Sequence, residues 1–123
     1  MRLWLLLLIG SIAGGCITPS IPIPPPDPAE MQFQLTTTDT TSSAVFQYPP
    51  HEAYQGSTAY VLDQRTGQGV FSIANADGSI GPTLPFPAKL GDQVVVTIQN
   101  TEQSASTCIV LKDGAQDPNV YCQ

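Results

Sequence analysis

Residues 31–123 consist of short runs of strand-forming residues separated by turn residues, and this spacing restricts the fold more than any other feature. Residues 31–35 alternate apolar and polar side chains, which is the pattern of a half-buried strand. Further runs lie at 43–48, 58–62, 70–74, 93–99, 107–112 and 120–122, and prolines interrupt a weaker run at 80–86. No stretch has helical spacing. Short strands at this spacing are typical of a sandwich or a barrel.

The length of this region narrows the fold class. Glycine- and aspartate-containing turn signals lie at 63–69, 75–78, 90–92 and 113–114, and about 93 residues is close to the size of an immunoglobulin-like domain. We therefore predict an all-β fold, a single antiparallel Ig-like β-sandwich of about seven strands. The expected core consists of Phe33, Val45, Val61, Phe71, Ile73, Val94, Val96, Ile98, Ile109 and Leu111.

A series of turn motifs between residues 56 and 107 resembles a known group of modules. In order, they are Gly56-Ser57, Ala59-Tyr60-Val61, Thr66-Gly67, Ala76-Asp77-Gly78-Ser79, Gly91-Asp92-Gln93-Val94 and Ser104-Ala105-Ser106. The series is similar to the bacterial Ig-like and carboxypeptidase-regulatory-like modules of envelope proteins. The resemblance implies an antiparallel β-sandwich. It implies no enzymatic activity, because these modules serve mainly as spacers, scaffolds and adhesive units.

Residues 1–15 have the three parts of a secretory signal peptide. A basic start with Arg2 precedes an apolar run at 3–9 and a stretch of small residues at 10–15. The alternative is a transmembrane anchor, but that needs about 18 apolar residues, and this run fades earlier. We therefore expect export of the chain.

Cys16 stands where the signal peptide would be cleaved. The stretch Ala13-Gly14-Gly15-Cys16 resembles the lipobox of bacterial lipoproteins, although leucine is favoured where Ala13 stands. The resemblance implies lipid attachment at Cys16 and cleavage before it, and two or three acyl chains would anchor the protein to a membrane firmly. Ile17 in place of an aspartate resembles the outer-membrane class, if the host is Gram-negative. The alternative is an ordinary signal peptide that leaves Cys16 as a thiol.

Half of the twelve prolines lie between residues 17 and 30. Such a segment favours an extended polyproline-II-like spacer of about 3.1 Å per residue. The expected organisation is therefore a signal peptide at 1–15, a lipidated tether at 16–30 and the sandwich at 31–123. A proline-rich ligand for a recognition domain is the alternative interpretation of the segment.

The two remaining cysteines, Cys108 and Cys122, are expected to form a disulfide, since an exported chain matures in an oxidising compartment. The bond would stabilise the fold by about 3 kcal/mol in the chain-entropy account. Two unpaired buried thiols are the alternative.

The charge of the chain restricts its partners. Cleavage would remove Arg2, one of four basic side chains, and none of ten acidic ones, which changes the net charge from −6 to about −7. This acidity without a basic patch argues against nucleic-acid binding.

The sequence offers no catalytic or metal-binding constellation. Aligned on an EF-hand loop, the Asp77-Gly78 turn would need carboxylates where Ile73 and Leu84 stand, so we interpret it as a hairpin turn. His51 is the sole histidine and has no clustered cysteines or acids for a zinc site. We expect no enzyme activity, no metal and no cofactor.

The stretch that contains Tyr48, His51 and Tyr54 is the candidate binding patch, because tyrosines are frequent binding hot spots. The alternative is that both tyrosines cover the edge of the sandwich, and burial of both would end the binding hypothesis. The expected function is that of a membrane-anchored envelope lipoprotein whose sandwich serves in structure or interaction. Two alternatives are a module that recognises a glycan or protein through 48–54, and a subunit of a larger assembly completed through an exposed edge such as 31–37.

Overall fold

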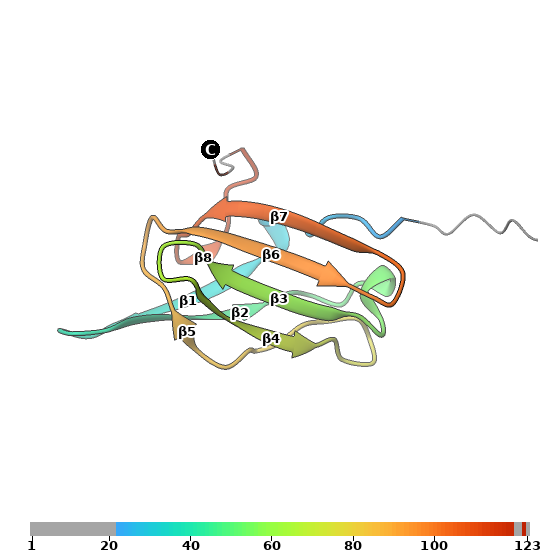
Figure 1. The fold of residues 1–123 in the computed structure, drawn as a ribbon, viewed down its shortest axis with the longest axis horizontal. Helices are drawn as coiled ribbons and strands as arrows, with labels where there is room; N and C mark the ends of the chain where they lie inside the picture. Colours follow the sequence, from blue (N-terminus) through green and yellow to red (C-terminus); the bar gives the residue numbers. More distant parts are fainter. Residues whose placement is uncertain (1–21, 120–121, 123) are drawn as a thin grey trace, which may run out of the picture.

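Two four-stranded antiparallel sheets packed face to face form the body of the protein (Figure 1). A computed structural model describes residues 22–119 and 122, and it confirms the predicted antiparallel β-sandwich, which is compatible with an Ig-like fold. The strands are β1 (Gln32–Thr37), β2 (Ser42–Gln47), β3 (Thr58–Asp63), β4 (Gln68–Ile73), β5 (Phe86–Pro87), β6 (Gln93–Gln99), β7 (Ser104–Val110) and β8 (Gly114–Ala115), with 3-10 turns η1 (Pro28–Glu30) and η2 (Glu52–Tyr54).

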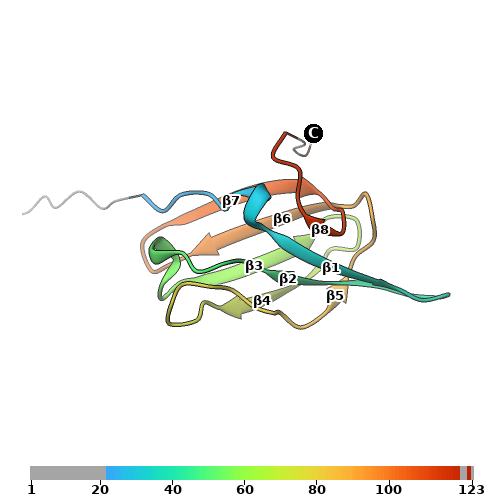
Figure 2. The ribbon, with the colours of Figure 1, turned by 180° about the vertical axis from the view of Figure 1, so that it is seen from behind.

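The strand order is β5-β2-β1-β8 in one sheet and β4-β3-β6-β7 in the other. Figure 2 shows the first sheet from its outer side, with the β1–β2 hairpin extending beyond the body of the sandwich. The weak run at 80–86 forms only the short strand β5 and an isolated bridge between Ile80 and Tyr48, as its prolines led us to expect. The expected last strand at 120–122 lies largely outside the described residues, and β8 is a strand that we did not predict.

The core lies between the sheets and is filled by alternate residues of each strand. In β6, Val94, Val96 and Ile98 are buried and the residues between them are only half-buried. Most of the expected core residues are confirmed, but Phe71 and Ile73 are exposed and Val45 is half-buried. The buried apolar residues are Met31, Phe33, Ala44, Phe46, Tyr48, Tyr54, Ala59, Val61, Ile80, Phe86, Ala88, Val94, Val96, Ile98, Ile109 and Leu111.

Strand pairing explains why Phe71 and Ile73 point outward. Tyr60 of β3 pairs with Phe71 of β4, and paired residues of neighbouring strands point to the same face of a sheet. Because Ala59 and Val61 face the core, Tyr60 and therefore Phe71 face the opposite side. The prediction that Phe71 and Ile73 belong to the core was wrong. A shift of one residue in the alternation moves every side chain of a strand to the opposite face of the sheet.

The described part of the proline-rich segment, 22–30, lies against the sandwich. The hydroxyl groups of Tyr54 and Thr107 donate hydrogen bonds to the carbonyl oxygens of Pro24 and Pro26, at 2.8 and 2.7 Å. Figure 2 shows this segment running beside β7 before β1 begins. A free spacer was expected here. These residues instead pack because their carbonyl groups meet hydroxyl donors on the sandwich.

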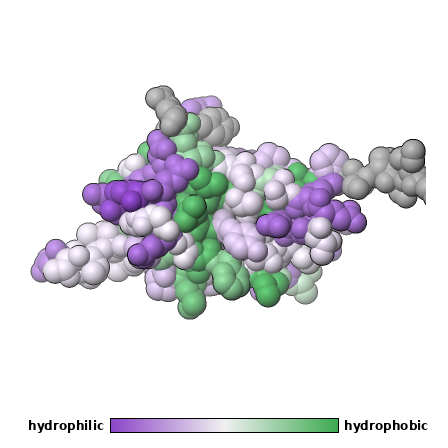
Figure 3. All heavy atoms as spheres, in the orientation of Figure 1, coloured by the Kyte–Doolittle hydropathy of each residue, from purple (hydrophilic) through white to green (hydrophobic). Residues whose placement is uncertain are grey.

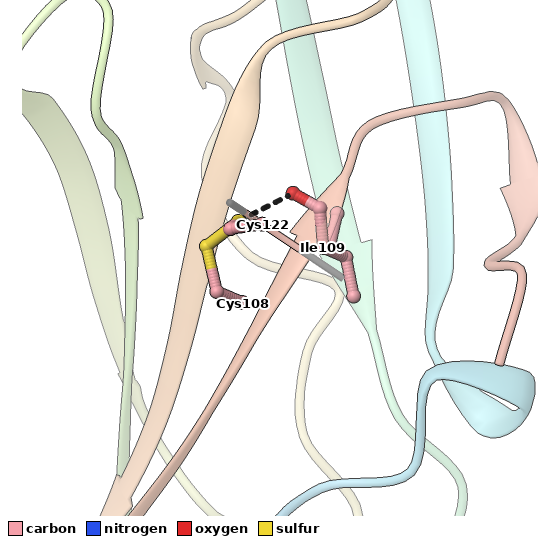
Figure 4. Close-up of a disulfide and its surroundings, with 3 residues drawn as sticks. All are labelled: Cys108, Ile109 and Cys122. Atoms are coloured by element: carbon pink, nitrogen blue, oxygen red, sulfur yellow. Dashed lines mark hydrogen bonds between the residues drawn. A yellow bond between two sulfur atoms is a disulfide. The ribbon is translucent and has the colours of Figure 1, made fainter. Parts of the chain in front are cut away.

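The predicted disulfide between Cys108 and Cys122 is present, with Cα atoms 5.3 Å apart (Figure 4). Cys108 lies on β7, and the N–H of Cys122 donates to the Cys108 carbonyl oxygen at 3.4 Å. The sulfur of Cys122 lies 3.3 Å from the carbonyl oxygen of Ile109. The bond therefore holds the end of the chain at β7.

Candidate functional site

The predicted binding patch is not a surface, because both of its tyrosines are buried in the core. The Tyr48 and Tyr54 rings lie 5.5 Å apart, and the Tyr48 hydroxyl oxygen accepts a hydrogen bond from the Asp27 N–H at 3.0 Å. Desolvation by burial raises the pKa of both phenols. The two side chains hold the N-terminal segment against the sandwich. A binding surface at 48–54 that depends on exposed Tyr48 and Tyr54 side chains is therefore wrong.

His51 is half-buried and has a local structural role. Its Nδ1 atom accepts a hydrogen bond from the Ala53 N–H at 3.2 Å, which caps η2. The imidazole ring stacks on Tyr54 with ring centres 4.4 Å apart. Both interactions orient the loop that carries Tyr54 into the core.

The turn at 75–79 packs against the same loop. The Asp77 carboxylate accepts hydrogen bonds from the N–H and hydroxyl of Ser79, which lower the pKa of Asp77. Gly78 has a φ of +83°, and an added Cβ would collide with the backbone of His51. The Asp77 carboxylate therefore stabilises the turn itself.

A surface that the sequence did not reveal lies on the outer face of the β4-β3-β6-β7 sheet, which we call the outer face. Four large apolar side chains are exposed there: Tyr60 by 44%, Leu62 by 43%, Phe71 by 66% and Ile73 by 70%. Figure 3 shows apolar residues forming a band across the strands, with hydrophilic residues on both sides of it. Apolar patches with a polar rim mark interaction sites in soluble domains.

The outer face carries no Asp, Glu, Lys or Arg side chain on any of its four strands, although ten acidic residues occur in the chain. A water-exposed sheet face normally alternates buried residues with polar or charged ones. Its outward positions are Thr58, Tyr60, Leu62, Gly69, Phe71, Ile73, Gln93, Val95, Thr97, Gln99, Ser104, Ser106, Cys108 and Val110. A neutral face of this kind favours a neutral partner over a charged one.

Gly69 keeps a shallow depression of about 310 Å³ open between β3 and β4. Tyr60, Leu62, Val70 and Phe71 line it together with the glycine. A Cβ added at Gly69 would collide with the carbonyl oxygen of Val61, so this position requires glycine. The shape of the outer face at this depression therefore depends on glycine at position 69.

A pair of buried carboxyl groups, Asp63 and Asp92, lies at one end of the same sheet. The Oδ1 atom of Asp63 accepts hydrogen bonds from the N–H groups of Arg65 and Thr66, at 2.8 and 3.1 Å. Asp92 accepts from the Arg65 guanidinium at 2.8 Å and from the Lys89 N–H at 3.0 Å. The Oδ2 atom of Asp63 is buried and, within the described residues, no N–H or O–H group donates to it.

Opposite pKa shifts of the two carboxyl groups follow from this arrangement. Burial, followed by the hydrogen bond to Asp92, raises the pKa of Asp63. Burial opposes ionisation of Asp92 as well, but hydrogen bonds from Arg65, Asp63 and the Lys89 N–H lower its pKa to about 2. Two carboxyl groups can share a hydrogen bond only when one holds a proton. Asp63, whose pKa is raised, is the carboxyl group that would hold that proton.

Other expected sites are either outside the described residues or without structural support. Cys16 lies outside the described residues. Within residues 22–119 and 122, no three His, Cys, Asp or Glu side chains are grouped as metal ligands require. No helix in that part of the chain has the length and hydropathy for a membrane span. Comparisons with protein-family models, curated proteins and solved structures give no match.

Proposed function

We propose that this protein is a membrane-anchored envelope lipoprotein whose β-sandwich serves an interaction role through the outer face. The observation that carries the interaction role is the uncharged outer face, with four large apolar side chains exposed to water. The cost of exposing apolar area is about 25 cal/mol per Å², so covering these side chains with a partner is favourable. The anchoring role rests on the residues around Cys16.

The packing of residues 22–30 gives the proposed anchor a short reach. Because Ile23 is already hydrogen-bonded to Gln103 at 2.8 Å, only the residues between Cys16 and Ile23 would separate the proposed lipid from the sandwich. Six residues span about 20 Å when fully extended. The sandwich would therefore be held close to the membrane, with the β6–β7 turn nearest to it and the tip of the β1–β2 hairpin far from it.

Membrane attachment is tested with Cys16→Ser. The unaltered protein is expected to remain with membranes through high-salt washing and to enter the detergent phase, because hydrocarbon chains are insensitive to salt. The serine variant is expected in the aqueous phase. Cys122→Ser is the matched control, because it removes a different cysteine and should leave the partition unchanged. Equal partition of the Cys16→Ser and unaltered proteins would contradict the anchoring role.

The second candidate function is that of a subunit in a larger envelope assembly. We expected its contact edge at 31–37. β2 pairs with β1 along one side, but β8 pairs only with Gln32 and Phe33 on the other, so part of that edge stays open. The open edge of β4 favours this alternative as well.

A further inference from the structure

Of the described strands with six or more residues, β4 alone has no buried residue. Its side chains at Phe71 and Ile73 are exposed on the outer face, and those at Val70 and Ser72 are only half-buried on the inner side. β4 pairs with β3 on one side alone. The strand is thus open on its outer face and along one edge.

The backbone groups along that edge have no partner in the described part of the chain. The Ala74 N–H donates to the Ser57 carbonyl oxygen, and hydrogen-bonded pairs alternate along an antiparallel ladder. Consequently the N–H and C=O groups of Gly69, Phe71 and Ile73 point away from β3. Unpaired groups in a row are a template for another strand.

The other sheet edges are short, covered or only partly open. β5 and β8 have two residues each. β8 pairs only with Gln32 and Phe33 of β1, and beyond it the Leu35 N–H donates to the Asp113 carboxylate. β7 is longer, but Pro24 and Pro26 of the N-terminal segment are hydrogen-bonded beside it and Cys122 is bonded to it. Natural edge strands avoid pairing through brevity, proline, charge or a covering segment, and β4 (QGVFSI) has six residues and neither a proline nor a charged side chain.

We propose that β4 pairs antiparallel with β4 of a second copy of this chain, about a two-fold axis that places Phe71 opposite Phe71 of the second copy. The inference rests on the proposed interaction role of the sandwich and deepens it by naming a partner at the β4 edge, beside the outer face and not over it. The pairing would join the two β4-β3-β6-β7 sheets into one continuous sheet of eight strands.

The side chains of β4 suit this register. The two Phe71 rings would be directly opposite, and cross-strand aromatic pairs are favourable. Ile73 would lie beside Gly69 of the second copy, over the depression that the glycine keeps open. No charged side chain lies on β4, so two acidic molecules would meet along a neutral strand.

Cysteine cross-linking of full-length protein extracted in mild detergent tests the register. Phe71→Cys would place two sulfurs on the axis, with Cα atoms about 5.5 Å apart in a hydrogen-bonded pair, within the range of a disulfide. Tyr60→Cys is the matched control on the same face, because two copies of Tyr60 would be separated by three strand spacings, about 14 Å. We expect a covalent dimer on oxidation with copper phenanthroline for Phe71→Cys, and none for Tyr60→Cys or the unaltered protein.

Light scattering with the detergent contribution subtracted tests the association itself. The unaltered protein should have twice the mass of one chain. Phe71→Lys should weaken the association at least about tenfold, because like charges would be directly opposite. Leu90→Lys is the control, since Leu90 is equally exposed, by 69%, but lies away from β4, and it should remain dimeric.

A monomeric mass for the unaltered protein, or equal cross-linking of the Tyr60→Cys and Phe71→Cys variants, would overturn the pairing. A monomer that still carries lipid on Cys16 would overturn this inference and leave the anchoring proposal standing. A dimer that carries no lipid on Cys16 would overturn the anchoring proposal and leave this inference standing.

Discussion

Replacing Asp63 with asparagine should stabilise the protein at neutral pH. The buried Oδ2 atom of Asp63 has no donor within the described residues, and interaction with the Asp92 carboxyl group contributes to the raised pKa of Asp63. In Asp63→Asn, the amide oxygen still accepts from the N–H groups of Arg65 and Thr66, and the amide nitrogen donates toward Asp92 at every pH. The variant thus imitates the protonated carboxyl group permanently.

The sign of the pH dependence follows from the raised pKa of Asp63. A group whose pKa is higher in the folded state stabilises the fold below its unfolded pKa, and this contribution is lost as the pH rises through the folded pKa. The amide side chain of the Asp63→Asn variant does not titrate, so the difference between variant and unaltered protein should be small in acid and should grow toward pH 8.

The expected gain in the free energy of unfolding comes from one hydrogen bond to a charged acceptor, which contributes about 1.5–3 kcal/mol. Part of this gain is offset because an amide oxygen is a weaker acceptor than a carboxylate oxygen. We expect a net gain of about 1–2 kcal/mol in the free energy of unfolding at pH 8. At about 4–8 °C per kcal/mol for a domain of this size, the melting temperature should rise by about 4–16 °C.

Thermal unfolding followed by circular dichroism between pH 4 and pH 8 measures this difference. Asp63→Ala is the control, because it also removes the carboxyl group but leaves the N–H groups of Arg65 and Thr66 without an acceptor, and it should be destabilising at all pH values. An Asp63→Asn variant that melts below the unaltered protein at pH 8 would refute the reasoning, since it would mean that the ionised carboxylate is the stabilising form.

The remaining predictions concern the ends of the chain. A soluble form that begins at residue 31 should be less stable than one that begins at residue 22 by about 2–4 kcal/mol in urea unfolding, because several hydrogen bonds of about 1 kcal/mol each are lost; equal midpoints would mean that residues 22–30 do not belong to the domain. Tyr54→Phe should lower the free energy of unfolding by about 1 kcal/mol through the lost bond to Pro24, and no change in the longer form would argue against this contact. Cys122→Ser should cost about 3 kcal/mol, and reduction of the unaltered protein should reproduce that loss.

The alternation of apolar and polar side chains, together with the turn residues, was sufficient to predict the fold class. The β6 run QVVVTIQ and the turn glycines located the strands to within a few residues. The face of β4 could not be predicted, because the run VFSIA permits either Phe71 or Val70 to face the core. Hydrophobicity alone favours the larger side chain, whereas pairing with β3 decides the matter.

The candidate site was missed for the same reason. Phe71 and Ile73 were assigned to the core, so no exposed face was visible in the sequence. Tyr48 and Tyr54 were candidates for a binding patch, with cover of the sandwich edge as the alternative, and the structure supports the alternative because both are buried. The N-terminal segment packs onto them through hydrogen bonds with both hydroxyl groups. Both errors concern contacts between residues distant in sequence, which local patterns do not encode.

The intact mass of the protein extracted from membranes, measured before and after reduction, tests the anchored sandwich most directly. The account predicts a chain that begins at Cys16, carries added hydrocarbon mass, and gains two hydrogen atoms when the bond between Cys108 and Cys122 is reduced. A chain that still begins at Met1, or that begins at Cys16 without added hydrocarbon, would contradict the anchoring.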